Sequence, residues 1–283
     1  MQENLQTLLS RYQSGFSLEQ AFYTSTEILS AEWKAIWKEH WIYAGNIAQL
    51  KKAGDYFLYK INQDEIIIIK GNNGEIHAHY NTCTHRGSAI CLEEKGHAAK
   101  LICPYHQWVF DKDGRLLNAR MMPDDFCKEQ YNLRSVVVEV IEGLIFISLA
   151  KEPPSFSTIR KSLAPFVKTY NIKEAKIACQ KNYTLRANWK LVAENFRECY
   201  HCGGAHPEYC SAVIGANLRE DTSELTNEKN KVWSEKGLAT ELIEVTPGTT
   251  TYAVRYPLRP GIESYSTDGK KVSIPMGHHL DHD

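Results

Sequence analysis

Two short stretches, Cys83-Thr84-His85-Arg86-Gly87 and Cys103-Pro104-Tyr105-His106, decide how the first half of this chain folds. Each stretch supplies one cysteine and one histidine, so together they offer two thiolates and two imidazoles. Pro104 stiffens the second stretch, and Gly87 permits a close approach of the backbone in the first. We therefore expect two loops that face each other and bring four metal-binding side chains together.

This donor set fits two kinds of metal site. A Rieske [2Fe–2S] cluster uses two cysteines and two histidines, and so does one kind of structural zinc site. Zinc sites, however, usually pair Cys with Cys and His with His, whereas each stretch here mixes the two. The spacing therefore favours the cluster, and Cys91 and His97, which lie between the stretches, are not expected to be ligands. The expected ligands are Cys83, His85, Cys103 and His106.

Short β-rich runs separated by turns extend from Trp41 to about Leu149. Asn72-Asn73-Gly74 and Asp113-Gly114 are two of the turn signals. Many short strands at this spacing predict a small all-β domain over residues 41–150. Both Cys/His stretches follow a predicted strand, which places them on loops at one end of that domain.

The flanking segments have a different pattern. Residues 1–40 read as helical, with a capping-box pattern at Thr24-Ser25-Thr26-Glu27 followed by apolar residues at helical spacing. Pro153-Pro154 breaks the chain after the β domain, and mixed structure follows over residues 151–283. We therefore expect a helical segment over residues 1–40, the β domain over residues 41–150 and a further domain of mixed structure over residues 151–283.

The bulk properties exclude several classes of protein. The 283 residues carry a formal net charge of -1, which gives no argument for binding to nucleic acid or to a membrane surface. No apolar run is long enough for a transmembrane helix, and the N-terminus does not resemble a signal peptide, so we expect a cytoplasmic protein. Without secretion, the 8 cysteines indicate metal or redox chemistry rather than disulfides.

A second group of candidate ligands lies at residues 188–206. In one helix, Glu194, Glu198 and His201 would share a face. Gly203-Gly204 would then end the helix, so that His206 could turn back toward His201. Two histidines and a carboxylate form a common Fe(II) site with open positions for O₂. Cys199-x-x-Cys202 would also suit a thioredoxin-like or zinc site, but it lacks the usual strand-to-helix context.

At these motifs the chain resembles the large (alpha) subunits of the Rieske non-heme iron oxygenases, from about Tyr23 to the C-terminus. The resemblance lies in Cys-Thr-His-Arg-Gly, in Cys-Pro-Tyr-His-Gln-Trp, and in Asn-Trp-Lys…Glu-Asn…Glu-Cys-Tyr-His…His. It implies an α+β protein, with an all-β Rieske domain (41–150) followed by a partial helix-grip α+β catalytic domain (151–283). Residues 1–40 would pack on the catalytic domain.

The resemblance also implies roles for the candidate residues. Cys83 and Cys103 would hold one iron of the cluster, and the two histidines of the same loops the other. His201 and His206 would bind a mononuclear Fe(II). In a homotrimer, Glu198 would connect His201 to His106 of a neighbouring subunit and carry the electron between the two iron sites. Electrons would come from a flavin- or ferredoxin-type reductase, and O₂ and a small molecule would be the substrates.

Within this family, the Glu-Cys-Tyr-His-Cys stretch is most similar to enzymes that demethylate quaternary ammonium compounds. Gln107 stands where ring dioxygenases have glycine, and only two residues separate Asn195 from Glu198, one fewer than in those enzymes. An aromatic ring-hydroxylating dioxygenase and a Rieske electron carrier without catalysis are the alternatives. Candidates for an aromatic cage around the ammonium group are Trp233, Tyr252 and Tyr256.

One feature departs from the family pattern. The family's third iron ligand is a carboxylate on a C-terminal helix far downstream of the two histidines. The stretch from Gly277 to Asp283 contains histidines and aspartates, but it comes too early and in the wrong context. We therefore expect that the C-terminal part of the catalytic domain is missing, and that this chain binds the cluster well but binds mononuclear iron weakly or not at all.

Overall fold

The computed structural model describes residues 5–13, 16–169, 171–197, 200–214, 223–235, 242–246, 249–252 and 259. The chain forms two compact units, which are described separately. The β unit comprises residues 30–157 together with 171–181, and the helical unit comprises residues 1–29, 158–170 and 182–283. The chain thus begins in the helical unit, enters the β unit at residue 30, and leaves the β unit twice, after residue 157 and after residue 181.

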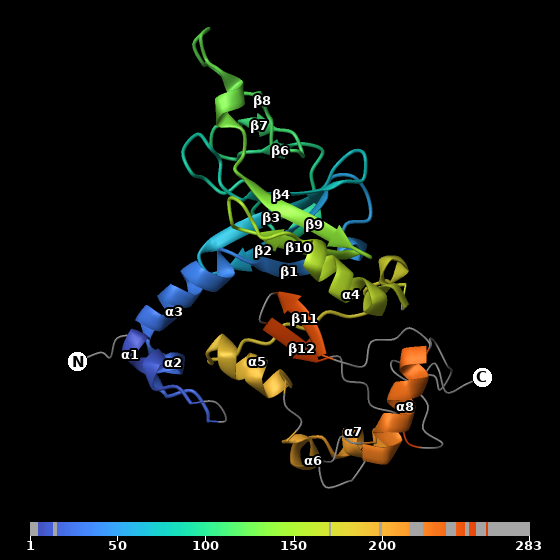
Figure 1. The fold of residues 1–283 in the computed structure, drawn as a ribbon. Helices are drawn as coiled ribbons and strands as arrows, with labels where there is room; N and C mark the ends of the chain where they lie inside the picture. The colour runs from blue at the N-terminus through green and yellow to red at the C-terminus, as the bar shows by residue number, and fades with distance from the viewer. Residues whose placement is uncertain are drawn as a thin grey trace. The chain divides into compact units, whose positions relative to one another are not determined.

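The β unit is built on a seven-stranded antiparallel sheet with the strand order β1-β10-β9-β4-β3-β2-β5 (Figure 1). Strand β3 lies near its centre, and Ile66, Ile67, Ile68 and Ile69 are all fully buried. Ile66 and Ile68 belong to one hydrophobic core, and Ile67 and Ile69 belong to another. Because successive side chains of a strand point to opposite faces, this run of isoleucines fills a core on each side of the sheet. The strands are β1 (Trp41–Asn46), β2 (Asp55–Ile61), β3 (Asp64–Lys70), β4 (Ile76–Tyr80), β5 (Lys95–His97), β9 (Ser135–Ile141) and β10 (Leu144–Ser148).

A second, three-stranded sheet covers one of these two cores. It contains β6 (Leu101–Ile102), β7 (Val109–Phe110) and β8 (Leu116–Asn118) in that order. Leu101 and Phe110 from this sheet share a buried cluster with Ile67 and Ile69. This core also contains both candidate ligand cysteines. The all-β prediction for this part of the chain is therefore confirmed among the described residues.

The N-terminal residues are helical, as predicted, but in four short pieces. Leu8, Phe22 and Ile28 form their small core. The cap of the third piece is Ser25, whose hydroxyl oxygen accepts a hydrogen bond from the Ile28 N–H at 3.4 Å, so the capping pattern begins one residue later than expected. The pieces are α1 (Leu5–Ser10), α2 (Ala21–Thr24), α3 (Thr26–Glu32) and a π-helix (Trp33–Trp37).

The remaining elements are mostly short helices. Two further strands form a separate hairpin. No helix among the described residues is long and apolar enough to cross a membrane. The helices are α4 (Ser157–Thr169), α5 (Trp189–Arg197), α6 (Cys202–Ala205), α7 (Pro207–Ala212) and α8 (Ser223–Glu235), the hairpin is β11 (Leu242–Thr246) with β12 (Thr249–Tyr252), and 3₁₀ turns occupy Ile47–Gln49, Lys128–Tyr131 and Ile172–Glu174.

Candidate metal centres

The first Cys/His loop follows strand β4 and closes on itself through two backbone hydrogen bonds. The Cys83 N–H donates to the Ser88 carbonyl at 2.8 Å, and the Gly87 N–H donates to the Cys83 carbonyl at 2.9 Å. Gly87 has φ +77°, the left-handed conformation that glycine adopts without strain. This tight loop turns the backbone around the Cys83 side chain.

The second loop joins β6 to β7 and repeats the same pattern. The Cys103 N–H donates to the Trp108 carbonyl, and the Gln107 N–H donates to the Cys103 carbonyl, both at 2.9 Å. Gln107 occupies the position equivalent to Gly87 and also has positive φ, +58°. The two loops are therefore local copies of one another, and the second one holds a residue with a side chain in a left-handed position.

The two loops bring the cysteines together in the core. Cys83 and Cys103 are 2% and 1% exposed, and their thiols are hydrogen-bonded to each other. Burial raises the pKa of the Cys83 thiol to about 11, although N–H groups of His85 and Arg86 that donate to its sulfur oppose the shift. The same N–H groups would stabilise a thiolate bound to iron, since hydrogen bonds to sulfur delocalise its negative charge.

The two histidines also lie side by side. The ring centroids of His85 and His106 are 4.6 Å apart, at an interplanar angle of 73°. In both rings Nδ1 is buried and has no hydrogen-bond partner. Burial and the neighbouring His106 lower the pKa of His85, which keeps its imidazole in the neutral form that binds metals. Buried polar atoms without a partner are rare in folded proteins, so two adjacent imidazole nitrogens of this kind fit a pair of metal-binding side chains.

The geometry fits a cluster with two different irons. Among the described residues, no three or more His, Cys, Asp or Glu side chains surround one point as a single metal ion would require. A Rieske cluster instead needs one pair of thiolates and one pair of imidazoles. Two paired thiols and two paired imidazoles are what the loops present, so the four residues fit this group.

The residues between the loops are engaged elsewhere. The His97 Nδ1 lies 2.9 Å from a carboxylate oxygen of Asp55 on strand β2. The thiol of Cys91 is hydrogen-bonded to the hydroxyl group of Tyr56, and burial raises its pKa to about 11. These contacts agree with the expectation that neither residue is a ligand.

Buried polar side chains anchor the two loops, and no sequence motif pointed to them. The amide of Asn81, just before the first loop, accepts hydrogen bonds from the N–H groups of Ile90 and Cys91 at 3.0 and 2.9 Å. The same amide donates to the Cys91 carbonyl at 2.8 Å and to the Glu65 carboxylate at 3.1 Å. Asn81 is 4% exposed, and its buried side chain fixes the position of Ile90 and Cys91, where the chain leaves the first loop.

A second buried contact joins strand β4, which precedes the first loop, to the β7–β8 turn, which follows the second loop. The Nε2 atom of His79 on β4 lies 2.9 Å from the Lys112 carbonyl oxygen in the β7–β8 turn. The ammonium group of Lys112 donates to the Ala99 carbonyl at 2.8 Å, just before β6. His79 and Lys112 are both buried. Such links depend on residues far apart in the sequence.

The second candidate centre lies in the helical unit. The ring centroids of His201 and His206 are 5.3 Å apart, at an angle of 73°, so the expected pair does form. The path of the chain differs from the prediction, because α5 ends at Arg197 and the glycines expected to end it lie within the separate helix α6. His201 and His206 flank this four-residue helix. His201 therefore does not share a helix face with Glu194.

Other contacts in this unit fix the start of α5. The side-chain oxygen of Asn188 accepts a hydrogen bond from the Lys190 N–H at 3.0 Å, and its amide donates to the Tyr23 carbonyl at 3.1 Å. The hydroxyl group of Tyr23 donates to the carboxylate of Glu194 at 2.9 Å. The amide of Asn195 lies 3.5 Å from Nδ1 of His201. Residues from the N-terminal segment thus hold the helix that precedes the histidine pair.

Several predicted residues lie outside the described part of the chain. Glu198 and Cys199 are among them, and so are Tyr256 and the stretch 277–283; the side chains of Trp233 and Tyr252 are also not described. Their predicted roles stay predictions.

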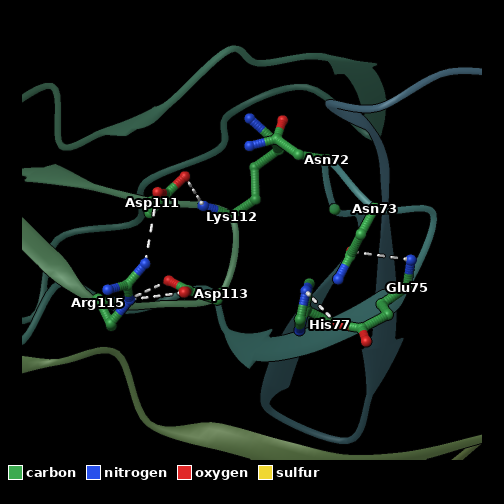
Figure 2. A pocket seen from close by; sticks show the side chains of 9 residues that line it. Asn72, Asn73, Glu75, His77, Asp111, Lys112, Asp113 and Arg115 are labelled. Carbon is green, nitrogen blue, oxygen red and sulfur yellow. Dashed lines mark hydrogen bonds and ion pairs between the residues drawn. The ribbon is translucent and has the colours of Figure 1, made fainter.

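A polar cavity of about 250 Å³ opens in the β unit, between the turn after β3 and the β7–β8 turn. Figure 2 shows its lining, where Arg115 reaches Asp113 and Asp111 while His77 lies near Glu75 across the cavity. The Arg115 guanidinium lies 2.6 Å from the Asp113 carboxylate. None of the candidate metal ligands lines this cavity.

Comparison with known families agrees with this arrangement. Residues 40–136 match the Rieske [2Fe-2S] domain, and residues 172–260 match the ring hydroxylating alpha subunit (catalytic domain). The chain therefore contains a Rieske domain and a match to the catalytic domain of the ring-hydroxylating oxygenase alpha subunits, and the expected α+β class is confirmed. A Rieske domain implies a [2Fe–2S] cluster, and this family also uses mononuclear iron.

Individual relatives point to one branch of the family. The glycine betaine monooxygenase oxygenase subunit of Chromohalobacter salexigens is 35% identical over 273 residues, which make up 94% of this chain and 61% of the relative. The carnitine monooxygenase oxygenase subunit of Acinetobacter baumannii is 34% identical over 206 residues, or 70% of this chain and 54% of the relative. The crystal structure of the quaternary ammonium Rieske monooxygenase CntA with its substrate L-carnitine matches with a TM-score of 0.62 and 33% identity, over 69% of this chain and 57% of that chain. The chain spans about three fifths of the length of the glycine betaine relative.

Proposed function

We propose that this chain is the oxygenase component of a Rieske non-heme iron system that hydroxylates an N-methyl group of a small quaternary ammonium compound. The observation that carries the proposal is the pair of buried, unpartnered imidazole nitrogens beside two buried thiols. The support for the substrate class is the similarity to glycine betaine and carnitine monooxygenase oxygenase subunits. The alternatives, ring dioxygenation and electron transfer alone, have no equally specific support.

The chain's own residues would hold two iron centres. When bound, these would supply single electrons and activation of O₂. The thiolates of Cys83 and Cys103 would hold one cluster iron, and Nδ1 of His85 and of His106 would hold the other. His201 and His206 would hold the mononuclear iron.

The structure suggests how the protein assists this chemistry. The N–H groups that donate to Cys83 disperse the charge of the sulfur. The two cluster histidines are only partly buried, so their outer edges can pass electrons to and from a partner. Asn188 and Tyr23 hold the start of α5, and so fix the helix before the iron histidines.

The overall reaction would replace an N-methyl C–H bond with C–OH. One oxygen atom of O₂ enters the product, and the other leaves as water after two electrons and two protons are supplied. The resulting hemiaminal breaks its C–N bond to release formaldehyde and the demethylated amine. The electrons would come from a flavin- or ferredoxin-type reductase.

We also propose the domain organisation and the route between the centres. Residues 41–150 would form the Rieske domain and residues 151–283 would belong to the catalytic domain, with residues 1–40 packed on it. The hydrogen bonds from Tyr23 to Glu194 and from Asn188 to Tyr23 support the last point. In a homotrimer, Glu198 would carry the electron from His106 of one subunit to His201 of the next.

The first experiment is anaerobic reconstitution, followed by iron and sulfide analysis and an EPR spectrum. Two irons, two sulfides and a Rieske-type signal in the reduced protein are expected. A colourless protein that contains zinc would overturn the proposal.

A second experiment tests the substrate class and the role of Glu198. Once the mononuclear site is also loaded with Fe(II), the protein should release formaldehyde when it is given a reductase, O₂ and glycine betaine or carnitine. Glu198→Gln should abolish this release and leave the cluster spectrum unchanged. Consumption of an aromatic hydrocarbon without formaldehyde release would favour the dioxygenase alternative instead.

A further inference from the structure

The indole ring of Trp108 lies directly on the candidate cluster ligand His85. The two ring centroids are 4.6 Å apart and the rings are almost parallel, with an interplanar angle of 9°. Trp108 is 2% exposed. His85 comes from the first ligand loop and Trp108 from the end of the second, so this contact joins the two loops across the candidate cluster site.

Two further aromatic rings hold Trp108 in this orientation. Phe126 and Tyr131 contact its indole edge-on, at centroid distances of 5.7 and 5.6 Å and angles of 71° and 80°. These two rings also stack on each other at 4.6 Å. The hydroxyl of Thr84, the neighbour of His85, donates to the Tyr131 carbonyl at 2.6 Å. The indole therefore has little freedom to turn away from the imidazole.

The other cluster histidine has a different environment. Its neighbour Tyr105 lies over His106 at 3.8 Å with a tilt of 36°, but Tyr105 is 61% exposed. A side chain on the surface can move, whereas a buried one in a close-packed cluster cannot do so freely. Among the described residues, a buried aromatic face lies against the imidazole of His85 and not against that of His106.

We infer that Trp108 is a positioning residue for the cluster, which fixes the plane of the His85 ring and lowers the reduction potential of the iron that His85 binds. The inference rests on the proposed function, because it concerns the cluster that these loops would hold. Its physical basis is the negative face of the indole ring, which attracts electron-poor groups.

The direction of the effect follows from charge. The iron held by two neutral imidazoles accepts the added electron more readily than the iron held by two thiolates, which already carry negative charge. In the oxidised state the iron draws electron density from the His85 ring, so that ring is more attractive to the indole face. Trp108 therefore stabilises the oxidised state more than the reduced state. The buried indole also excludes water, which would otherwise favour the more highly charged reduced cluster.

The test compares three variants of the full chain loaded with the cluster: Trp108→Leu, Trp108→Phe and Phe126→Leu. Phe126→Leu is the matched control, because Phe126 contacts Trp108 in the same aromatic cluster but is not stacked on His85. Each protein is reduced stepwise while its visible spectrum is recorded, and the EPR g-values of the reduced form are measured. Cluster content and thermal stability are measured in parallel.

Trp108→Leu should shift the redox equilibrium about tenfold toward the reduced cluster. For one electron this corresponds to a reduction potential that is higher by about 59 mV. Its g-values should shift, because the His85 plane is no longer fixed. Trp108→Phe should change both quantities in the same direction but less, since it keeps an aromatic face. Phe126→Leu should lower thermal stability but change the potential and the g-values much less than Trp108→Leu, because the indole stays on His85 and Tyr131 still holds it.

Three results would overturn the inference. The first is an unchanged potential in both Trp108 variants while the wild-type signal is normal, and the second is an equal shift in Phe126→Leu. If Trp108→Leu does not retain the cluster, Trp108→Phe alone decides, and an unchanged potential and spectrum would reject the inference. The third is a wild-type protein without any Rieske signal, which would overturn the proposed function itself and this inference with it.

Discussion

Replacing Gly87 with alanine tests why the first ligand loop has glycine at this position. The reason can be the backbone conformation of the residue or a lack of space for a side chain. Gly87 has φ +77°, and a Cβ atom built there would meet no other atom within 4 Å. Alanine therefore fits sterically but must adopt a left-handed conformation, which costs a residue with a side chain about 1–2 kcal/mol. We expect Gly87→Ala to lower the free energy of unfolding by that amount.

Two other glycines of the β unit provide matched controls. Gly74, in the turn after β3, has φ +88° and also has open space around its Cβ position, so Gly74→Ala should lose a similar 1–2 kcal/mol. At Gly114, with φ +87°, a Cβ atom would lie 2.6 Å from Cε1 of the buried His79. Gly114→Ala should therefore lose more, about 2–5 kcal/mol, because overpacking adds to the backbone strain.

The assay is urea unfolding of the wild type and the three variants at neutral pH, together with the cluster content of each protein after anaerobic reconstitution. Gly87→Ala should also retain less cluster, since its loop carries two of the candidate ligands, whereas Gly74→Ala should retain the wild-type amount. The reasoning fails if Gly87→Ala unfolds at the wild-type urea concentration. It also fails if Gly114→Ala is no less stable than the other two.

Three further predictions follow from individual contacts. Burial raises the pKa of Asp111, but hydrogen bonds from Lys100 and from a backbone N–H outweigh it and hold that pKa below its ordinary 3.8. The ionised Asp111 carboxylate therefore stabilises the fold above about pH 4, and this stabilisation is lost as the pH falls through the lowered pKa. Asp111→Asn should lower the free energy of unfolding by about 1 kcal/mol at pH 7 and by progressively less in acid. Urea unfolding at several pH values measures this difference. Asn81→Ala should cost about 2–4 kcal/mol in the same assay, because it leaves buried N–H groups without acceptors; a loss below 1 kcal/mol would contradict the anchoring role. Tyr23→Phe should cost only about 0.5–1 kcal/mol through the lost hydrogen bond to Glu194, and hydrogen exchange should be faster in α5; unchanged exchange there would show that the bond does not hold the helix.

The second ligand loop shows how a local rule and a tertiary requirement can conflict. Glycine would suit the position of Gln107, whose φ is +58°, better than glutamine does. The Gln107 side chain accepts a hydrogen bond from the Arg120 guanidinium at 3.3 Å. This contact offsets part of the strain, and it could not be foreseen from the residues of the loop.

The sequence by itself predicted the four candidate cluster ligands, the all-β domain around them and the candidate histidine pair. These features depend on spacing over a few residues and on alternation of apolar and polar side chains, which a linear chain displays directly. It did not determine where α5 ends. The glycines at 203 and 204 have high turn propensity, yet they lie inside α6, since local propensity is a weak preference that tertiary context overrides.

Only the tertiary structure revealed what surrounds the ligands. The contact of His79 with the Lys112 carbonyl joins residues 33 positions apart, and the stack of Trp108 on His85 joins the two loops. The unpartnered Nδ1 atoms of His85 and His106 are likewise visible only once the core around them is packed. Ligand identity is a property of short segments, whereas the orientation and electronic environment of each ligand arise from side chains that folding brings together across the chain.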